Sequence, residues 1–118
     1  MEFVPRKLTG HNGSVYSLAL GEDGNFFTGA GDGWIAEWPF ENGEDGRLVA
    51  EAADQVFSLI KLRDAPWLVA GTMQGQLYFI NLDFPDQIRN MSFHEQSIFA
   101  IAQIENRIVA AGGDGKIS

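Results

Sequence analysis

Apolar and polar residues alternate in short runs along most of the 118-residue chain. Three runs, Ser14–Leu20, Gln55–Leu62 and Ser97–Ile104, are rich in β-branched and aromatic residues, which is typical of half-buried strands. Each run is followed by a polar turn, a second apolar run and a turn that contains glycine. Long glycine-free stretches with apolar residues every three or four positions do not occur, so the pattern excludes a helical architecture.

The three units recur at a nearly constant spacing. Ser17 and Ser58 occupy the same place in the first and second units and are 58 − 17 = 41 residues apart, and Ala100 follows Ser58 after 42 residues. A third strand-like run follows each of the first two glycine turns, at 34–40 and 76–82, and the linking segments 47–52 and 87–92 supply a fourth. The repeat is therefore a four-stranded antiparallel meander of about 40 residues, the size of one β-propeller blade.

The glycine-rich stretch between Phe26 and Trp38 admits two interpretations. Closely spaced glycines can bring backbone N–H groups to a phosphate, but such loops are followed by a helix. The residues after Gly33 have a strand pattern instead. We therefore expect a tight hairpin turn, in which the glycines adopt positive φ and Asp32 accepts hydrogen bonds from turn N–H groups or from His11.

In the first unit a Gly-His pair precedes the first strand, a Thr lies in the second, an Asp in the turn and a Trp in the third. This pattern resembles that of a WD (tryptophan-aspartate) repeat, which is found in a family of β-propeller proteins. The resemblance implies a hydrogen-bonded structural network of His11, Thr28, Asp32 and Trp38. In the third unit His94 and Asp114 persist, whereas Ala52, Ala70, Gln74 and Ile80 occupy the four places in the second. Trp38-Pro39 and Ile80-Asn81 stand where the naming dipeptide would be.

Three blades do not close a ring, because known propellers use about 4 to 8 blades. We expect one partial propeller over residues 1–118, with an outer strand at 3–8, repeats at 10–51 and 52–92, and an incomplete repeat at 93–118. The outer strand would close a ring as a fourth-type strand; its residues are Phe3, Val4, Pro5, Arg6, Lys7 and Leu8. One explanation is that the chain is the amino-terminal portion of a longer propeller, whose remaining blades lie on another polypeptide or a cleaved segment. The alternative is a ring of identical copies joined head to tail.

Charge and composition narrow the possible partners. Sixteen acidic and eight basic residues give a net charge of −8, which repels nucleic acid and anionic membranes and favours basic or apolar partners. The absence of cysteine excludes disulfides and thiolate metal sites. The amino terminus lacks the apolar segment of a secretory signal, and no apolar run approaches the length of a membrane span. We therefore predict a cytoplasmic protein.

Little in the sequence suggests catalysis. Both histidines occupy the same repeat position, ahead of the first strand of a unit, which indicates a structural role. The first strands of the units contain Tyr16, Ser17, Phe57, Ser58 and Phe99, and not the converging carboxylates and histidines that catalysis would need. We predict no catalytic residues, no metal and no cofactor; a propeller-type metal hydrolase is the least favoured alternative. Glu37 occupies a position expected to face the core, where an unpaired carboxylate is costly. We therefore expect either that Glu37 has a partner such as a neighbouring arginine or that the strand is slightly shifted.

The resemblance implies a non-enzymatic scaffold that binds protein or peptide partners through its loops. Trp34 is aromatic where its equivalents are polar, which predicts exposure, and exposed tryptophan is a frequent anchor of interfaces. Trp67 aligns with polar residues in the same way. Met73 and Phe84 are weaker candidates for partner contact. The alternative function is structural, namely the assembly of a propeller ring from copies or from a complementary fragment.

Overall fold

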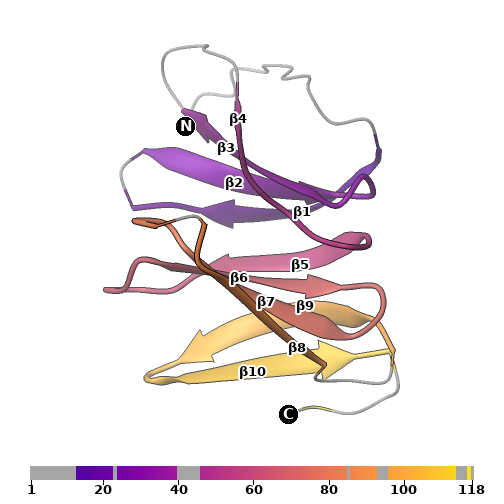
Figure 1. Cartoon of the computed structure of the whole chain (residues 1–118). Helices are drawn as coiled ribbons and strands as arrows, with labels where there is room; N and C mark the ends of the chain where they lie inside the picture. The colour runs from indigo at the N-terminus through magenta and orange to yellow at the C-terminus, as the bar shows by residue number, and fades with distance from the viewer. Residues whose placement is uncertain are drawn as a thin grey trace, which may run out of the picture.

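The computed structural model describes residues 13–22, 24–39, 46–84, 86–92, 96–113 and 117. Within these ranges every regular element is a β-strand (Figure 1). The strands are β1 (Val15–Leu20), β2 (Asn25–Ala30), β3 (Trp34–Pro39), β4 (Arg47–Glu51), β5 (Val56–Lys61), β6 (Trp67–Thr72), β7 (Gln76–Asn81), β8 (Ile88–Ser92), β9 (Ile98–Ile104) and β10 (Arg107–Gly112). The predicted all-β fold is confirmed, and the expected strand runs agree with these bounds to within two residues.

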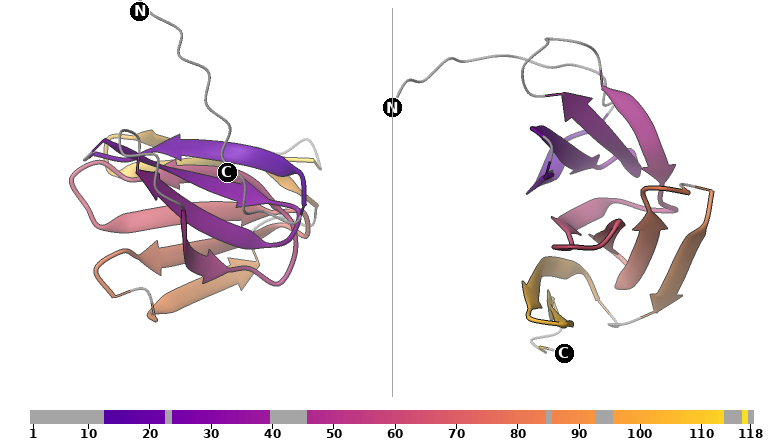
Figure 2. Two further views of the ribbon diagram at one scale, coloured as in Figure 1. Left: turned by 90° about the horizontal axis from the view of Figure 1, so that it is seen from above. Right: turned by 90° about the vertical axis from the view of Figure 1, so that its left-hand side faces the viewer.

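Consecutive strands pair into antiparallel meanders. Strands β1 to β4 form one four-stranded sheet, here called blade 1, and β5 to β8 form a second, blade 2. Strands β9 and β10 form a hairpin, and Ala111 makes a further antiparallel bridge with Ile117. Figure 2 shows the three sheets following one another along an arc that does not close. The predicted outer strand, Phe3–Leu8, lies outside the described residues, as do His11, His94 and Asp114.

The glycine-rich turns are hairpin connections, as the pattern predicts. Gly33 precedes β3 with a φ of 81°, and Gly75 precedes β7 with a φ of 82°. This left-handed region is strained for residues with a Cβ. At Gly33 a Cβ would also lie 2.6 Å from the carbonyl oxygen of Ala52. Because a strand and not a helix follows each turn, the phosphate-loop interpretation is excluded.

The first strand of each sheet, namely β1, β5 and β9, is here called its inner strand. Each inner strand contains a β-bulge near its first residue. In β1 the pairing with β2 skips Tyr16, and in β5 the pairing with β6 skips Phe57. In β9 the pairing with β10 skips Phe99. We call this end of the sheets, which also holds the β2–β3 and β6–β7 turns, the bulge end. The opposite end holds the β1–β2, β5–β6 and β9–β10 turns.

The core lies in the seams between successive sheets. Blade 1 packs on blade 2 through a cluster that includes Ala19, Phe27, Ile35, Leu68 and Ile80. Blade 2 packs on the β9–β10 hairpin through Val69, Leu77, Ile98 and Ala110. Because successive side chains of a strand point to opposite faces, each blade must be apolar on both faces to form a seam on each side.

Two glycines, in the second strands β2 and β6, allow the first strand of the next sheet to approach closely. A Cβ at Gly29 of β2 would lie 2.4 Å from Cγ1 of Val56, and one at Gly71 of β6 would lie 2.6 Å from Cγ2 of Ile98. Both distances are shorter than atoms tolerate. The two residues occupy equivalent register positions, opposite Ser17 and Ser58. The repeat therefore uses a glycine to set the spacing of each seam.

Candidate functional site

The bulge end carries a continuous row of three aromatic rings, one from each inner strand. The Tyr16 and Phe57 ring centroids are 4.9 Å apart, with an edge-to-face angle of 82°. The Phe57 and Phe99 centroids are 5.6 Å apart, and these rings are nearly parallel, at 9°. Both spacings lie in the range that favours aromatic pairs. We call Tyr16, Phe57 and Phe99 the aromatic row.

The bulges explain why these rings face outward. An extra residue in a bulge is left out of the strand pairing, and its side chain is redirected from the regular alternation. Tyr16 is 50% exposed and Phe99 is 59% exposed, although each belongs to an inner strand of a sheet. Phe57, between them, is half-buried. The row therefore places a large apolar surface in contact with solvent, held by backbone geometry that recurs in each unit.

Neighbouring turns extend this surface. Gly31, Met73 and Gly113 occupy one equivalent place, because the N–H of each donates to a carbonyl just before an inner strand. At Gly113 a Cβ would lie 3.1 Å from the Phe99 ring, and at Gly31 one would lie 3.4 Å from the Tyr16 ring. Glycine in these two places leaves room for the rings. Blade 2 has Met73 instead, 37% exposed, which adds apolar surface to the same end.

The four sequence-predicted contact residues separate into two pairs at opposite ends of the sheets. Trp34 and Met73 lie at the bulge end, whereas Trp67 and Phe84 lie at the opposite end. Both tryptophans are half-buried, so the exposure expected of them is only partial, because their strands pair on both sides. Phe84 is exposed. Sequence reasoning noted Tyr16, Phe57 and Phe99 as inner-strand residues but gave them no contact role.

The described part of the predicted structural network lies in blade 1. Trp38 Nε1 donates to Thr28 Oγ1 at 2.8 Å, and both side chains are buried. Asp32 Oδ1 accepts from the Trp34 N–H at 2.9 Å, as expected of an aspartate that caps a turn. In blade 2 the places of Thr28 and Trp38 are taken by Ala70 and Ile80, both fully buried. One blade thus uses a hydrogen bond where the other uses apolar packing.

Glu37 has the arginine partner that its position requires. Its Oε1 accepts from Arg47 Nε at 2.7 Å, and Arg47 Nη2 approaches the same oxygen at 2.6 Å. Its other oxygen accepts from the Asn25 side-chain amide. The three residues line a polar hollow of about 430 Å³ where blades 1 and 2 meet at the opposite end. The carboxylate is therefore neutralised at the mouth of the seam and does not enter the core.

A polar link joins the two blades beside this hollow. Lys61, at the end of β5, donates to Glu22 Oε1 at 3.0 Å and to the carbonyls of Leu62 and Ala65. The Lys61 hydrogen bond, the Asp64 N–H and the Lys61 charge lower the pKa of Glu22 below its ordinary value of 4.5. Gln103 occupies the place of Lys61 in β9, and its Oε1 accepts from the Arg63 N–H at 2.8 Å. Each seam therefore carries one polar link at this end.

Metal-binding clusters and membrane-spanning helices are both absent from the described residues. No group of three or more His, Asp or Glu side chains in these ranges could hold a metal ion. No helix that could cross a bilayer occurs in the same part of the chain.

Comparisons with known proteins identify the fold. A family model described as "WD domain, G-beta repeat" matches residues 4–38, the first unit of the chain. The crystal structure of the WD40 β-propeller domain of Doa1 matches with a TM-score of 0.82 at 15% sequence identity. The chain therefore has the fold of an open segment of a β-propeller, and its first unit is similar to a WD repeat. The match covers 93% of this chain and 38% of the Doa1 chain, so this chain spans well under half of the length of that one.

WD-repeat propellers typically mediate protein interactions and are generally non-catalytic scaffolds. No curated protein matches the sequence. At 15% identity the Doa1 structure establishes the fold alone, and the function of this chain must be argued from its own surfaces.

Proposed function

We propose that this propeller segment is a non-enzymatic protein-interaction module that binds a peptide segment across the bulge end. The observation that carries the proposal is the aromatic row. The three rings come from the first strands of three successive sheets, and the middle ring contacts both of the others, while the outer two remain half exposed or more. Exposed apolar patches rimmed by polar residues mark interaction sites, and aromatic side chains are enriched at interface hot spots.

The rigidity of the row supports this role. Each ring stands on a strand whose seam is set by close packing, so little conformational freedom is lost when a partner binds. Ser58 Oγ donates to the Ile98 carbonyl at 2.9 Å, which fixes β5 relative to β9 directly beside Phe57 and Phe99. Scaffolds of this kind bind through surface groups that are held by a stable frame. A cytoplasmic location remains part of the proposal.

The test is selection of peptides from a random displayed library against the 118-residue chain. We expect the selected peptides to lose binding to the double variant Tyr16→Ser, Phe99→Ser. The matched control is Leu20→Ser, Ile104→Ser, which removes apolar side chains that are 76% and 57% exposed from the opposite ends of β1 and β9. Peptides that bind the bulge-end variant as well as the parent chain, or a selection that yields no binding peptide, would refute the proposal.

A second candidate function is assembly with further propeller blades. It is favoured by the outward face of blade 1, the face turned away from blade 2, where Leu18 and Leu20 are 59% and 76% exposed. Together with Phe26 they line a hollow of about 420 Å³. The equivalent face of blade 2, with Leu59 and Leu68, packs on blade 1. A blade from another chain or from a second copy would cover the outward face in the same way.

Light scattering over a concentration series tests this second candidate. If copies join head to tail, the parent chain forms a dimer or trimer, and Leu18→Lys with Leu20→Lys returns it to a monomer. The lysines would place two charges in an apolar seam. A monomeric parent chain at all concentrations would eliminate self-assembly and leave only blades from another polypeptide.

A further inference from the structure

We infer that the outward face of blade 1 accepts a blade of another polypeptide, one whose first strand carries a serine opposite a glycine of its second strand. The β9–β10 hairpin of a second copy of this chain does not meet that requirement. The inference rests on the second candidate function, assembly with further blades, and specifies which blades fit. It arises from the two seams that the chain already contains.

The seam between blades 1 and 2 seats one β-branched side chain against a serine and a glycine. Val56, the first residue of β5, is fully buried, and a Cβ added to Gly29 of β2 would lie 2.4 Å from its Cγ1. Ser17 pairs with Gly29 in the register of β1 and β2, and its Oγ donates a long hydrogen bond, of 3.5 Å, to the Val56 carbonyl. The glycine therefore leaves room for the side chain, while the serine binds the backbone of the same residue.

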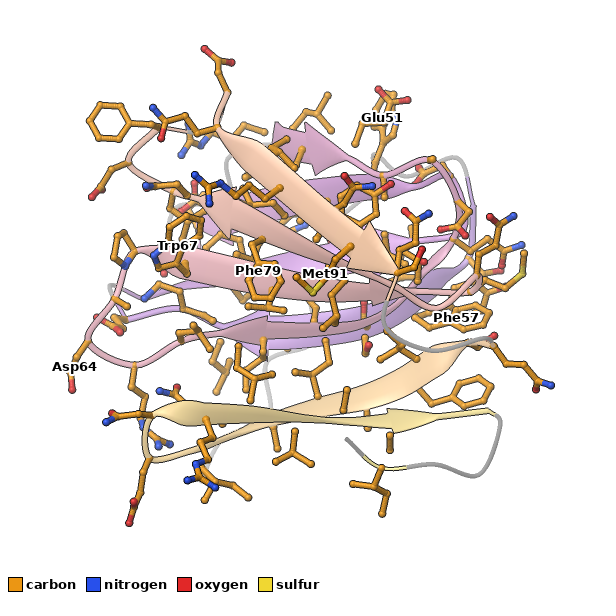
Figure 3. The ribbon with its side chains drawn as sticks, turned by 60° about the horizontal axis from the view of Figure 1, so that its bottom comes forward. Glu51, Phe57, Asp64, Trp67, Phe79 and Met91 are labelled. Carbon is orange, nitrogen blue, oxygen red and sulfur yellow. The ribbon has the colours of Figure 1, made fainter. Side chains whose placement is uncertain are left out.

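The seam between blade 2 and the β9–β10 hairpin repeats this arrangement. Ile98, the first residue of β9, is fully buried, and a Cβ added to Gly71 of β6 would lie 2.6 Å from its Cγ2. Ser58 pairs with Gly71 and donates from Oγ to the Ile98 carbonyl at 2.9 Å. Figure 3 shows Phe57, the bulge residue that directly precedes Ser58, beside this hairpin. We call each combination, Ser17 with Gly29 and Ser58 with Gly71, a Ser–Gly pair.

The serine and the glycine of a pair depend on each other. A Cβ added to Gly29 would lie 2.7 Å from Ser17 Oγ, and one added to Gly71 would lie 2.4 Å from Ser58 Oγ. Both distances are too short for non-bonded atoms in a packed interior. An alanine in place of either glycine would therefore collide with the serine of its own blade and with the side chain that the next sheet inserts.

The β9–β10 hairpin lacks both members of the pair. Ala100 and Ala111 pair with each other at the place that Ser58 and Gly71 occupy in blade 2. Ile101, the neighbour of Ala100, packs on blade 2, so the two alanines point to the other side of the hairpin. Ala100 has no side-chain donor, and the Cβ of Ala111 fills the space that glycine leaves open in the other sheets.

Blade 1 carries the counterpart of the two inserted side chains. Val15 begins β1 as Val56 begins β5, and in both strands a bulge follows this first residue. Val56 is fully buried, whereas Val15 is 54% exposed. Val15 therefore lies where the Ser–Gly pair of a preceding blade would receive it. A second copy offers no open pair, because its own β5 and β9 cover the two it has and its third place holds two alanines.

The test opens a Ser–Gly pair on the hairpin by the double change Ala100→Ser, Ala111→Gly. We expect this opened variant to reach a mass at least about twice that of the parent chain in light scattering over a concentration series, because a head-to-tail interface closes a ring or extends a filament. The parent chain should stay monomeric. The matched control exchanges the two residues, Ala100→Gly with Ala111→Ser. It should also stay monomeric, because it keeps a Cβ at position 111.

A third change locates the partner surface. Adding Val15→Lys to the opened variant should return it to a monomer, because an unpaired charge is costly in an apolar seam. Val15 is exposed in the single chain, so the monomer itself tolerates the lysine. This triple variant offers only a Ser–Gly pair and the parent offers only Val15, so an equimolar mixture of the two should form a heterodimer.

A second measurement does not depend on assembly. The change Ser58→Ala with Gly71→Ala gives blade 2 the two alanines of the hairpin, and we expect it to loosen the seam with β9. Hydrogen exchange of the β9 amides should become about tenfold faster or more, because overpacking at Ile98 favours opening of the hairpin. Ser58→Ala alone removes the hydrogen bond but leaves room for Ile98, so its effect should be smaller.

The outcomes separate this inference from the functions proposed above. A parent chain that assembles through Val15 and Leu18 would support assembly with further blades and would refute this inference, since a second copy offers no open pair. An opened variant that stays as monomeric as its control would also refute it, as would unchanged β9 exchange in the Ser58→Ala, Gly71→Ala variant. The peptide selection at the aromatic row tests other residues, so its failure would leave this inference standing.

Discussion

The face of blade 1 that packs on blade 2 and its outward face are built from the same strands, yet the inner-strand side chains are buried on the first face and exposed on the second. Ala19 and Phe27 point into the seam with blade 2 and are buried. Leu18 and Leu20, their neighbours in β1, point the other way and are among the most exposed apolar side chains of the described chain. Both faces are apolar because a blade inside a ring packs on both sides. Burial is therefore decided by which blades are present, not by the residue type.

The two faces also differ in how they use polar groups. The seam has the link between Lys61 and Glu22 at its margin and a long hydrogen bond, of 3.5 Å, from Ser17 Oγ to the Val56 carbonyl. The outward face has a buried hydrogen bond nearer its outer strands, between Trp38 and Thr28, and Phe26 stacks on Trp38 with a centroid distance of 6.5 Å. On the outward face, a tryptophan and its hydrogen bond hold β2 and β3 together without a facing sheet.

The largest contrast should come from leucine truncations on the equivalent faces of the two blades. Leu68→Ala removes a fully buried side chain from the seam and should lower the free energy of unfolding by about 2–5 kcal/mol. Leu18→Ala on the outward face should change it by less than about 0.5 kcal/mol, since that side chain already contacts solvent. Urea titration followed by tryptophan fluorescence measures both values. A large loss in Leu18→Ala would show that the outward face is covered in solution.

Glycine at the seam offers a second way to disturb only the covered face. Gly29→Ala places a methyl group against Val56 and should cost about 1–3 kcal/mol of unfolding free energy through overpacking. The combined change Gly29→Ala, Val56→Ala should cost less than the sum of the two single changes, because the second removes the atom that the first meets. A double-mutant cycle from the same titrations gives the coupling. Strict additivity would contradict the close approach of the strands.

The hydrogen bond on the outward face can be removed from either side. Thr28→Val leaves the buried Trp38 N–H without this acceptor and should cost about 1–2 kcal/mol. Trp38→Phe with Thr28→Val removes both partners, so the effect of the valine should be smaller in that background. Blade 2 already has an apolar pair in these places, Ala70 and Ile80. An equal effect of Thr28→Val in both backgrounds would mean that the bond does not contribute to stability.

The smallest effect concerns the polar link at the margin of the seam. Because its partners lower the pKa of Glu22 below 4.5, the stabilisation is fully present above that ordinary value and is lost as pH falls through the lowered pKa. Unfolding midpoints measured from pH 7 down to pH 3 should therefore fall less steeply in Glu22→Gln than in the parent chain. Asp83→Asn, an exposed acid at the same end, should leave the slope unchanged. Identical slopes for Glu22→Gln and the parent would contradict the link.

Most of the backbone was predictable from particular residues. The alternation in 14–20, 55–62 and 97–104 gave the inner strands, and Gly33 and Gly75 gave the turns, because positive φ has a distinctive residue preference. The partner of Glu37 was predicted only by type, since sequence does not show that Arg47 lies opposite it in β4. Trp34 and Trp67 align with polar residues of the other repeats, which predicts exposure, whereas strand pairing on both sides half-buries them.

The sequence by itself determined the repeat, the strand order and the apolar character of both faces of each blade, because these follow from local alternation and turn chemistry. Only the tertiary structure decided which apolar residues form a surface. Tyr16, Phe57 and Phe99 share a repeat position, but a bulge is a mismatch between two paired strands and is not encoded in either strand alone. Their contact with one another requires three sheets to be packed side by side. The aromatic row is thus a property of the assembled blades and not of any single repeat.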